Sequence, residues 1–121
     1  MANTSTLLAT LPIKLYGTTS VYMYSIAIDT INTDLTIRTA AAGKVQAIVG
    51  MIHDESANHT MIIKSNTTTI ARFEKAGSYQ FTIGGGVMAC SVPGQAIVLN
   101  ASATIDAILI YVMEADQLLI S

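Results

Sequence analysis

Short segments in which apolar and polar residues alternate dominate this chain. Asp34–Thr39 places Leu35 and Ile37 on one face and polar side chains on the other, and Ser78–Ile83 alternates in the same way. Successive side chains of an extended strand point to opposite faces, so a period of two predicts half-buried β-strands. The abundance of Ile, Val, Thr and Tyr in these segments favours the same structure.

Turn-forming residues separate many such segments. The further predicted strands are Ile13–Tyr16, Val21–Ile28, Val45–Ile52, Thr60–Lys64, Thr67–Phe73, Val87–Val92, Gln95–Leu99 and Thr104–Glu114. We find no convincing helix. Short strands punctuated this often predict an all-β fold, an antiparallel β-sandwich that we expect to be of jelly-roll type and to form one domain.

Two pairs of neighbouring strands are expected to form hairpins. Met61–Lys64 should pair with Thr67–Phe73 across Ser65-Asn66, because Asn tolerates the positive φ of a tight turn. Tyr79–Ile83 should pair with Val87–Val92 across three consecutive glycines, Gly84–Gly86, which we interpret as a hairpin tip rather than a phosphate loop.

The two ends of the domain are expected to differ. We expect residues 1–11 to form an extended N-terminal arm and residues 12–121 to form the β-sandwich domain. The first eleven residues contain no positively charged region of the kind that opens a secretory signal. The lone Cys90 excludes an internal disulfide and fits a reducing compartment. These features favour synthesis in a cytoplasm, or assembly there into a particle released later.

Charge is scarce in this chain. Hydrophobic residues make up 51% of the 121 residues and charged residues 12%, about half the usual charged share of about 25%. The longest apolar run, residues 107–113, is far shorter than the roughly 18–20 residues of a membrane-spanning helix. The apolar surplus therefore favours self-association. The net charge of −2, with scattered Lys and Arg, argues against a nucleic-acid partner.

The last predicted strand, Thr104–Glu114, is apolar on both faces through its middle, and Val45–Ile52 is similar. A two-layer sandwich buries only one face of each sheet, so a loop or another subunit must cover the second face. We favour a subunit interface over cover within the subunit. The candidate interface residues are Ile108, Leu109, Ile110, Tyr111 and Met113.

Candidate chemistry is sparse. The densest polar cluster contains His53, Asp54, Glu55 and His59, which could hold a transition metal or act in acid–base catalysis, or could form a solvated loop. No third strong ligand follows at a diagnostic spacing, and we prefer the loop. Cys90 has no candidate base in a nucleophile motif and is expected to be a small core residue. We therefore expect no enzyme, no cofactor and no metal.

Tyrosines and glycosylation motifs have both structural and functional interpretations. Tyr22 and Tyr24 share one strand face with Ile26 and Ile28, which favours core or interface packing over stacking on a sugar. Four Asn-x-Ser/Thr motifs occur, and we interpret them as coincidental. They begin at Asn3, Asn58, Asn66 and Asn100.

The segment Phe73–Ile83, with its order Gly77-x-Tyr79-x-Phe81, resembles a strand of tumour necrosis factor-like and complement-head jelly rolls. In those folds a Gly turn leads into a strand whose aromatic residues enter the core, and the subunits form trimers. The resemblance implies that Tyr79 and Phe81 are core residues. It also implies that Leu109 and Tyr111 face a trimer axis.

The short, Thr-, Ala- and Ile-rich, charge-poor chain also resembles small β-sandwich virion proteins of tailed bacteriophages, such as capsid decoration and head-fibre proteins. That likeness implies a homotrimer on a capsid, with the major capsid protein or another virion protein as partner and no membrane. Met1–Leu11 and Leu118–Ile120 resemble attachment segments. The alternative is a carbohydrate- or receptor-binding fibre-tip module that uses Tyr16, Tyr22 and Asn58.

Overall fold

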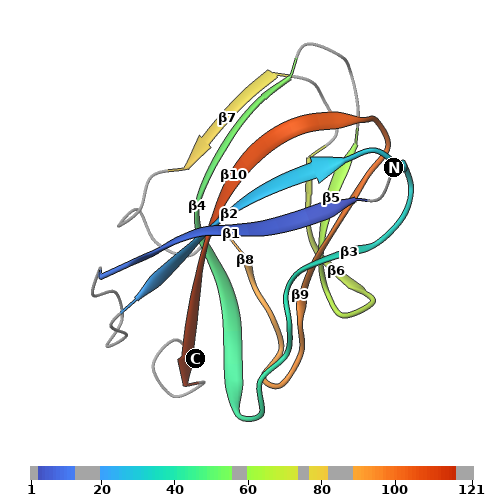
Figure 1. Ribbon diagram of the computed structural model, residues 1–121. Coiled ribbons are helices and arrows are strands. Elements are labelled where there is room, and N and C mark those ends of the chain that lie inside the picture. Colours follow the sequence, from blue (N-terminus) through green and yellow to red (C-terminus); the bar gives the residue numbers. More distant parts are fainter. Residues whose placement is uncertain (1–2, 13–19, 56–59, 74–76, 82–88, 117–121) are drawn as a thin grey trace.

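The computed structural model describes residues 3–12, 20–55, 60–73, 77–81 and 89–116, with only the backbone for 53–55, 73, 77–81, 106–107 and 116. Throughout these ranges the ordered elements are strands, and no helix occurs. They form two antiparallel sheets that pack on each other, as expected for a β-sandwich (Figure 1). The all-β prediction is thereby confirmed.

The larger sheet contains six strands in the order β1-β2-β10-β4-β7, and β8 also pairs with β4. Their bounds are β1 Thr4–Leu11, β2 Val21–Ile28, β4 Lys44–Glu55, β7 Gly77–Phe81, β8 Ala89–Cys90 and β10 Ile105–Asp116. The smaller sheet has the order β3-β9-β5-β6. Its strands are β3 Leu35–Arg38, β5 Met61–Ser65, β6 Thr68–Phe73 and β9 Ile97–Ala101.

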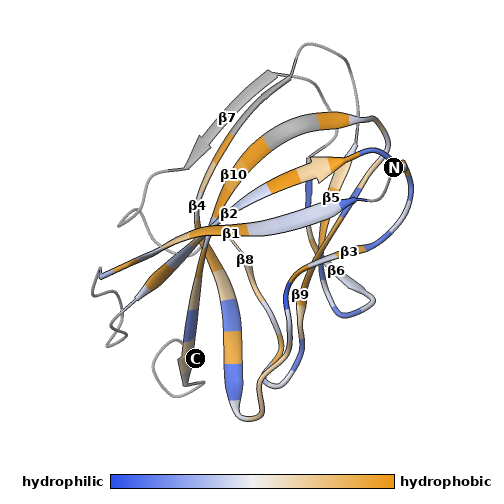
Figure 2. Ribbon diagram, in the orientation of Figure 1, coloured by the Kyte–Doolittle hydropathy of each residue, from blue (hydrophilic) through white to orange (hydrophobic). Residues whose placement is uncertain are grey.

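The main core lies between the two sheets. Large aliphatic side chains fill it from both sides, among them Ile26, Ile110 and Met51 of the larger sheet and Ile63 and Leu99 of the smaller one, each at most 1% exposed. Figure 2 shows hydrophobic residues along β2 and β10 and polar residues in the turn between β2 and β3. Burial of this apolar surface is the main source of stability for such a sandwich.

The hairpin between β5 and β6 is confirmed. Met61 pairs with Phe73 and Ser65 with Thr68, which brings the two strands together across the predicted turn. Asn66 adopts a φ of 50°, a left-handed conformation that Asn tolerates better than most residues. Its side-chain Oδ1 also accepts a 2.9 Å hydrogen bond from the Ala96 backbone N–H, which ties the hairpin to the start of β9.

The second predicted hairpin is wrong. β7 and β8 do not face each other; both pair antiparallel with β4 and therefore run in the same direction. β4 is 12 residues long, so it has room for two successive partners. Met51–Glu55 pairs with β7, and Ala47–Ile48 pairs with β8.

The expected N-terminal arm contains a strand of the larger sheet. β1 pairs antiparallel with β2 over its whole length, with an irregularity between Leu7 and Ala9. Its start is fixed by Asn3, whose Oδ1 accepts hydrogen bonds from the backbone N–H groups of Asp29 and Thr30 at 2.8 and 2.7 Å. Residues 4–11 are thus an edge strand attached to the body of the molecule rather than a detached segment.

Candidate functional site

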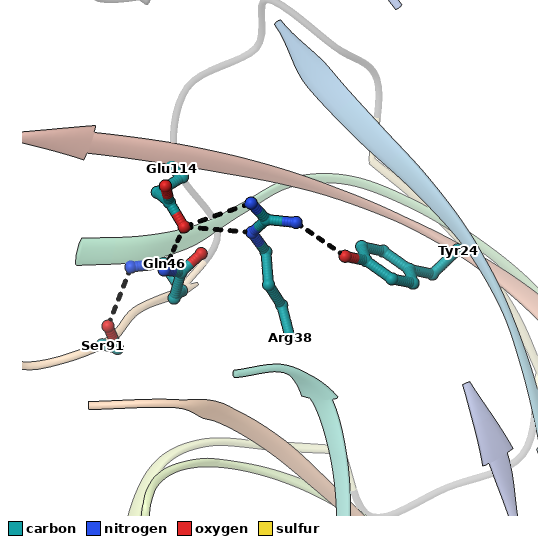
Figure 3. Close-up of polar contacts among 5 residues, drawn as sticks. All are labelled: Tyr24, Arg38, Gln46, Ser91 and Glu114. Atoms are coloured by element: carbon teal, nitrogen blue, oxygen red, sulfur yellow. Dashed lines mark hydrogen bonds and ion pairs between the residues drawn. The ribbon is translucent and has the colours of Figure 1, made fainter. Parts of the chain in front are cut away.

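A polar cluster joins the two sheets at one end of the main core (Figure 3). Arg38 of β3 reaches across to Glu114 of β10, with its Nε and Nη2 each 3.2 Å from the Glu114 Oε2. Its Nη1 donates a 2.8 Å hydrogen bond to the Tyr24 hydroxyl, and its guanidinium lies 3.8 Å from the centre of the Tyr22 ring. One Arg side chain therefore connects β3 to both β2 and β10.

The cluster continues into β4. The Gln46 Nε2 donates a 2.8 Å hydrogen bond to the same Glu114 Oε2, and the Gln46 backbone N–H donates one of 2.8 Å to the Ser91 hydroxyl. Gln46 is completely buried, and its Oε1 has no hydrogen-bond partner. Such an unpaired buried acceptor costs about 1–3 kcal/mol.

The electrostatics of the cluster favour a fixed ion pair. Partial burial opposes the charge of Arg38, but the Tyr24 hydroxyl and the Glu114 carboxylate outweigh it and raise the pKa of Arg38 above its ordinary value. All three guanidinium nitrogens have partners within the cluster. We therefore interpret the cluster as a clamp between the sheets rather than as a binding or catalytic centre.

The candidate interface residues of β10 divide into two groups. Ile108, Ile110 and Met113 are each at most 1% exposed within the single chain. They are therefore not available to a second subunit in this structure, contrary to the expectation from sequence. Leu109 and Tyr111 are only half-buried and lie on the face of β10 that points away from the main core.

Ile108 and Ile110 belong to the main core, whereas Met113 belongs to a second cluster of buried residues on the far side of the larger sheet. It contains Val21, Val45, Ala47, Val49, Met113 and Ala115, with Leu11, Cys90 and Tyr111 packed against it. The carboxyl-terminal part of β10 is thus buried on both faces by the subunit itself. The subunit covers this outward face only in part at Leu109 and Ile52. These two residues lie directly opposite each other on β10 and β4, and Ile52 is 44% exposed.

β1 contributes two further exposed apolar residues. It forms one edge of the larger sheet, contains no charged residue, and exposes Leu7 by 49% and Leu8 by 51%. Leu8 is the extra residue at the irregularity in the pairing with β2. The adjacent Leu7 and Leu8, which interrupt the alternation of β1, are a sequence signal for this irregularity.

The remaining candidates have mixed outcomes. Tyr24 is in the core, as the packing interpretation predicts, and Tyr22 is half-buried beneath Arg38. Cys90 is half-buried, and burial raises the pKa of its thiol. The side chains of residues 53–55, 79 and 81 lie outside what the structure describes, as do the whole of residues 16, 58, 59 and 84–86.

The Asn-x-Ser/Thr motifs that the structure covers have structural roles. The Asn3 Nδ2 donates to the Thr30 carbonyl at 2.9 Å, and the Asn100 Nδ2 donates to Asp34 at 2.8 Å. The Asn66 side chain holds Ala96, as described above. The bonds of Asn3 and Asn100 engage the amide nitrogen to which a glycan would be attached, which favours the coincidental interpretation of these two motifs.

No family model, curated protein or solved structure matches this chain. Within the described ranges, no group of three or more His, Cys, Asp and Glu side chains is placed to hold a metal ion. Over the same ranges, the structure has no helix of the length and hydropathy needed to cross a membrane.

Proposed function

We propose that this protein is a structural component of a virion, an oligomeric decoration or cementing protein on the capsid of a tailed bacteriophage. In this proposal it forms a homo-oligomer, with a trimer favoured, and binds the major capsid protein or another virion protein. It would be assembled in the host cytoplasm, and it would act by adhesion rather than by catalysis.

We further propose that the two sheets form a single jelly-roll domain. The central strands of the larger sheet have the order β2-β10-β4-β7, and the smaller sheet has the order β3-β9-β5-β6. Chain neighbours such as β2 and β3, or β4 and β5, thus alternate between the two sheets, as they do in a jelly roll. Jelly rolls are frequent in viral capsid proteins and in lectins.

The observation that carries the proposal is the character of the β1 edge. Natural proteins usually protect sheet edges with charge or Pro, because an open edge pairs readily with another chain. β1 has neither among its eight residues and exposes two leucines. We propose that the shell protein adds a strand to this edge, with main-chain hydrogen bonds supplying affinity and Leu7 and Leu8 supplying apolar contact.

The experiment is co-sedimentation with particles of the encoding virus prepared without this protein. Leu8→Lys introduces a charge on the β1 edge, and Val92→Lys is the matched control, because both side chains are 51% exposed. We expect saturable binding of the wild type and of Val92→Lys, and at least tenfold weaker binding of Leu8→Lys. Failure of the wild type to bind particles would reject the proposal.

A glycan array distinguishes the alternative role, a carbohydrate- or receptor-binding fibre-tip module. Specific glycan capture without particle binding would replace the decoration role by that one. The Arg38 guanidinium covers one face of the Tyr22 ring, which leaves that face unable to stack on a sugar.

A further inference from the structure

The outward face of the larger sheet differs from an ordinary solvent-exposed face. Across β10, Leu109 lies opposite Ile52 of β4 on one side and Ser25 of β2 on the other. Two residues further along β10, Tyr111 lies opposite Gly50 of β4 and Met23 of β2. We call this set the open face; its members are Met23, Ser25, Gly50, Ile52, Leu109 and Tyr111, with Thr6, Leu8 and Ala9 of β1 at its rim.

The open face carries no charge. Every side chain in the set is apolar or small and neutral, apart from the Tyr111 phenol. Antiparallel sheets that face water normally alternate apolar inward with polar outward residues. Here the outward positions of the central strands are as apolar as the inward ones, although Ile52 is 44% exposed and Leu109, Tyr111 and Met23 are half-buried.

The outward face of the smaller sheet shows the contrast. There Lys64 forms a 2.9 Å ion pair with Asp34, and Asn100 donates a 2.8 Å hydrogen bond to the same carboxylate. Arg72 lies on the neighbouring strand, opposite Ile62. This charged and hydrogen-bonded surface is suited to water, and covering it would cost the desolvation of an ion pair.

The outward side chains of the larger sheet that belong to the second cluster are fully buried within the subunit. Met113 is 0% exposed, Ala115 3% and Val49 0%, all on the same side of the sheet as Leu109 and Tyr111. The open face continues this buried surface toward Leu109 and Ile52. An additional layer over the open face would therefore extend an existing apolar core.

We propose that the layer over the open face is the open face of a second copy of this chain. A homotypic contact brings identical patches together, so each copy must be complementary to itself. Two uncharged faces meet this condition, because no like charges oppose each other and no charge is left unpaired. A charged partner surface would instead lose its hydration against neutral side chains without compensation.

The area of the open face determines how strongly two copies are expected to associate. A standard interface takes about 800 Å² per partner, and the subunit exposes 6085 Å² in total. The open face spans four strands at about 4.8 Å spacing and only a few residues along each strand. It is thus at the small end of specific interfaces, and we expect micromolar association that rises with concentration.

This inference rests on the self-association in the proposed function, but a contact between two identical patches joins two copies and therefore makes the oligomer a dimer in place of the favoured trimer. Its experiment needs no virus particle. Sedimentation velocity should be measured from about 1 µM to about 1 mM, which covers binding free energies of about −8 to −4 kcal/mol. Ile52→Lys places a charge in the open face. Ile31→Lys is the matched control, because Ile31 is 45% exposed but lies in the turn after β2.

We expect the wild type and Ile31→Lys to associate alike, and Ile52→Lys to associate at least tenfold more weakly with an unchanged circular dichroism spectrum. Thr6→Lys, at an exposed polar position on the rim, gives the same test should Ile52→Lys fail to fold. A wild type that stays monomeric over the whole range would overturn the inference. Equal association of all the folded variants would do the same. Particle binding can fail while self-association holds, so the two proposals are separable.

Discussion

Gln46 and Glu114 lie directly opposite each other on β4 and β10, and the Gln46 amide donates a 2.8 Å hydrogen bond to the Glu114 carboxylate. Arg38 binds the same carboxylate oxygen from the other sheet. One oxygen atom thus joins three strands of the sandwich. Since Gln46 is fully buried, this position requires a side chain that is neutral and donates a hydrogen bond to Glu114, and not only one of suitable size.

Gln46→Glu should be strongly destabilising at neutral pH. The substitution keeps the shape of the side chain but places a second carboxylate beside Glu114 in a buried position. A buried charge that is left without a partner of opposite sign costs about 3 kcal/mol or more of folding free energy. Urea denaturation measures the loss, which should shrink at acidic pH as the introduced carboxylate at position 46 is protonated. An equal loss at pH 7 and pH 4 would contradict this explanation.

Met113→Ala should lower stability without changing the association of subunits. Met113 is 0% exposed and packs in the second cluster, and truncating such a side chain costs about 2–5 kcal/mol. Thermal denaturation should show the same loss at low and high protein concentration. A loss that disappears on dilution would instead return Met113 to the subunit interface.

Asn66 should be replaceable by Asp but not by Ala. Asp retains both the tolerance of positive φ and an oxygen that accepts the hydrogen bond from Ala96. Ala loses both, and the left-handed conformation alone costs about 1–2 kcal/mol. Equilibrium unfolding of the two variants checks this difference; equal stabilities would show that the turn does not depend on this residue.

Asp34 should contribute stability that depends on acid. Hydrogen bonds from Asn100 and Lys64 lower its pKa below the usual 3.8. A lowered folded-state pKa gives stability that is present above the unfolded-state value and is lost as pH falls through the folded-state value. Asp34→Ala should therefore be less stable than the wild type at pH 7, by no more than about 1 kcal/mol because the pair is exposed. At pH 2 the two proteins should be nearly equal.

Alternation predicted most strands because tertiary packing agreed with local pattern there. Val21–Ile28 and the β5–β6 hairpin are examples, with a regular face in the first and a turn-forming Asn in the second. β1 was not predicted as a strand, since Leu7-Leu8 breaks the period where the pairing is irregular. The sequence also could not show that β7 and β8 share β4, because strand partners are set by long-range packing.

The site was predictable only in part for the same reason. The sequence showed that Thr104–Glu114 is apolar on both faces, but not which outward positions the subunit covers itself. Met113 is fully buried and Leu109 is only half-buried, although both side chains lie on the outward face of β10. The clamp of Arg38 with Glu114 joins residues 76 apart in the chain, and no local motif announces it.

Cross-linking of single cysteines tests the homotypic contact most directly. In a Cys90→Ser background, Leu109→Cys places a thiol at the centre of the open face, and Thr36→Cys places one at an exposed position on the outward face of the smaller sheet. With a short bifunctional maleimide at concentrations where the protein associates, we predict efficient cross-linking between subunits through residue 109 and little through residue 36. Equal cross-linking at the two positions, or cross-linking through residue 36 alone, would contradict the account.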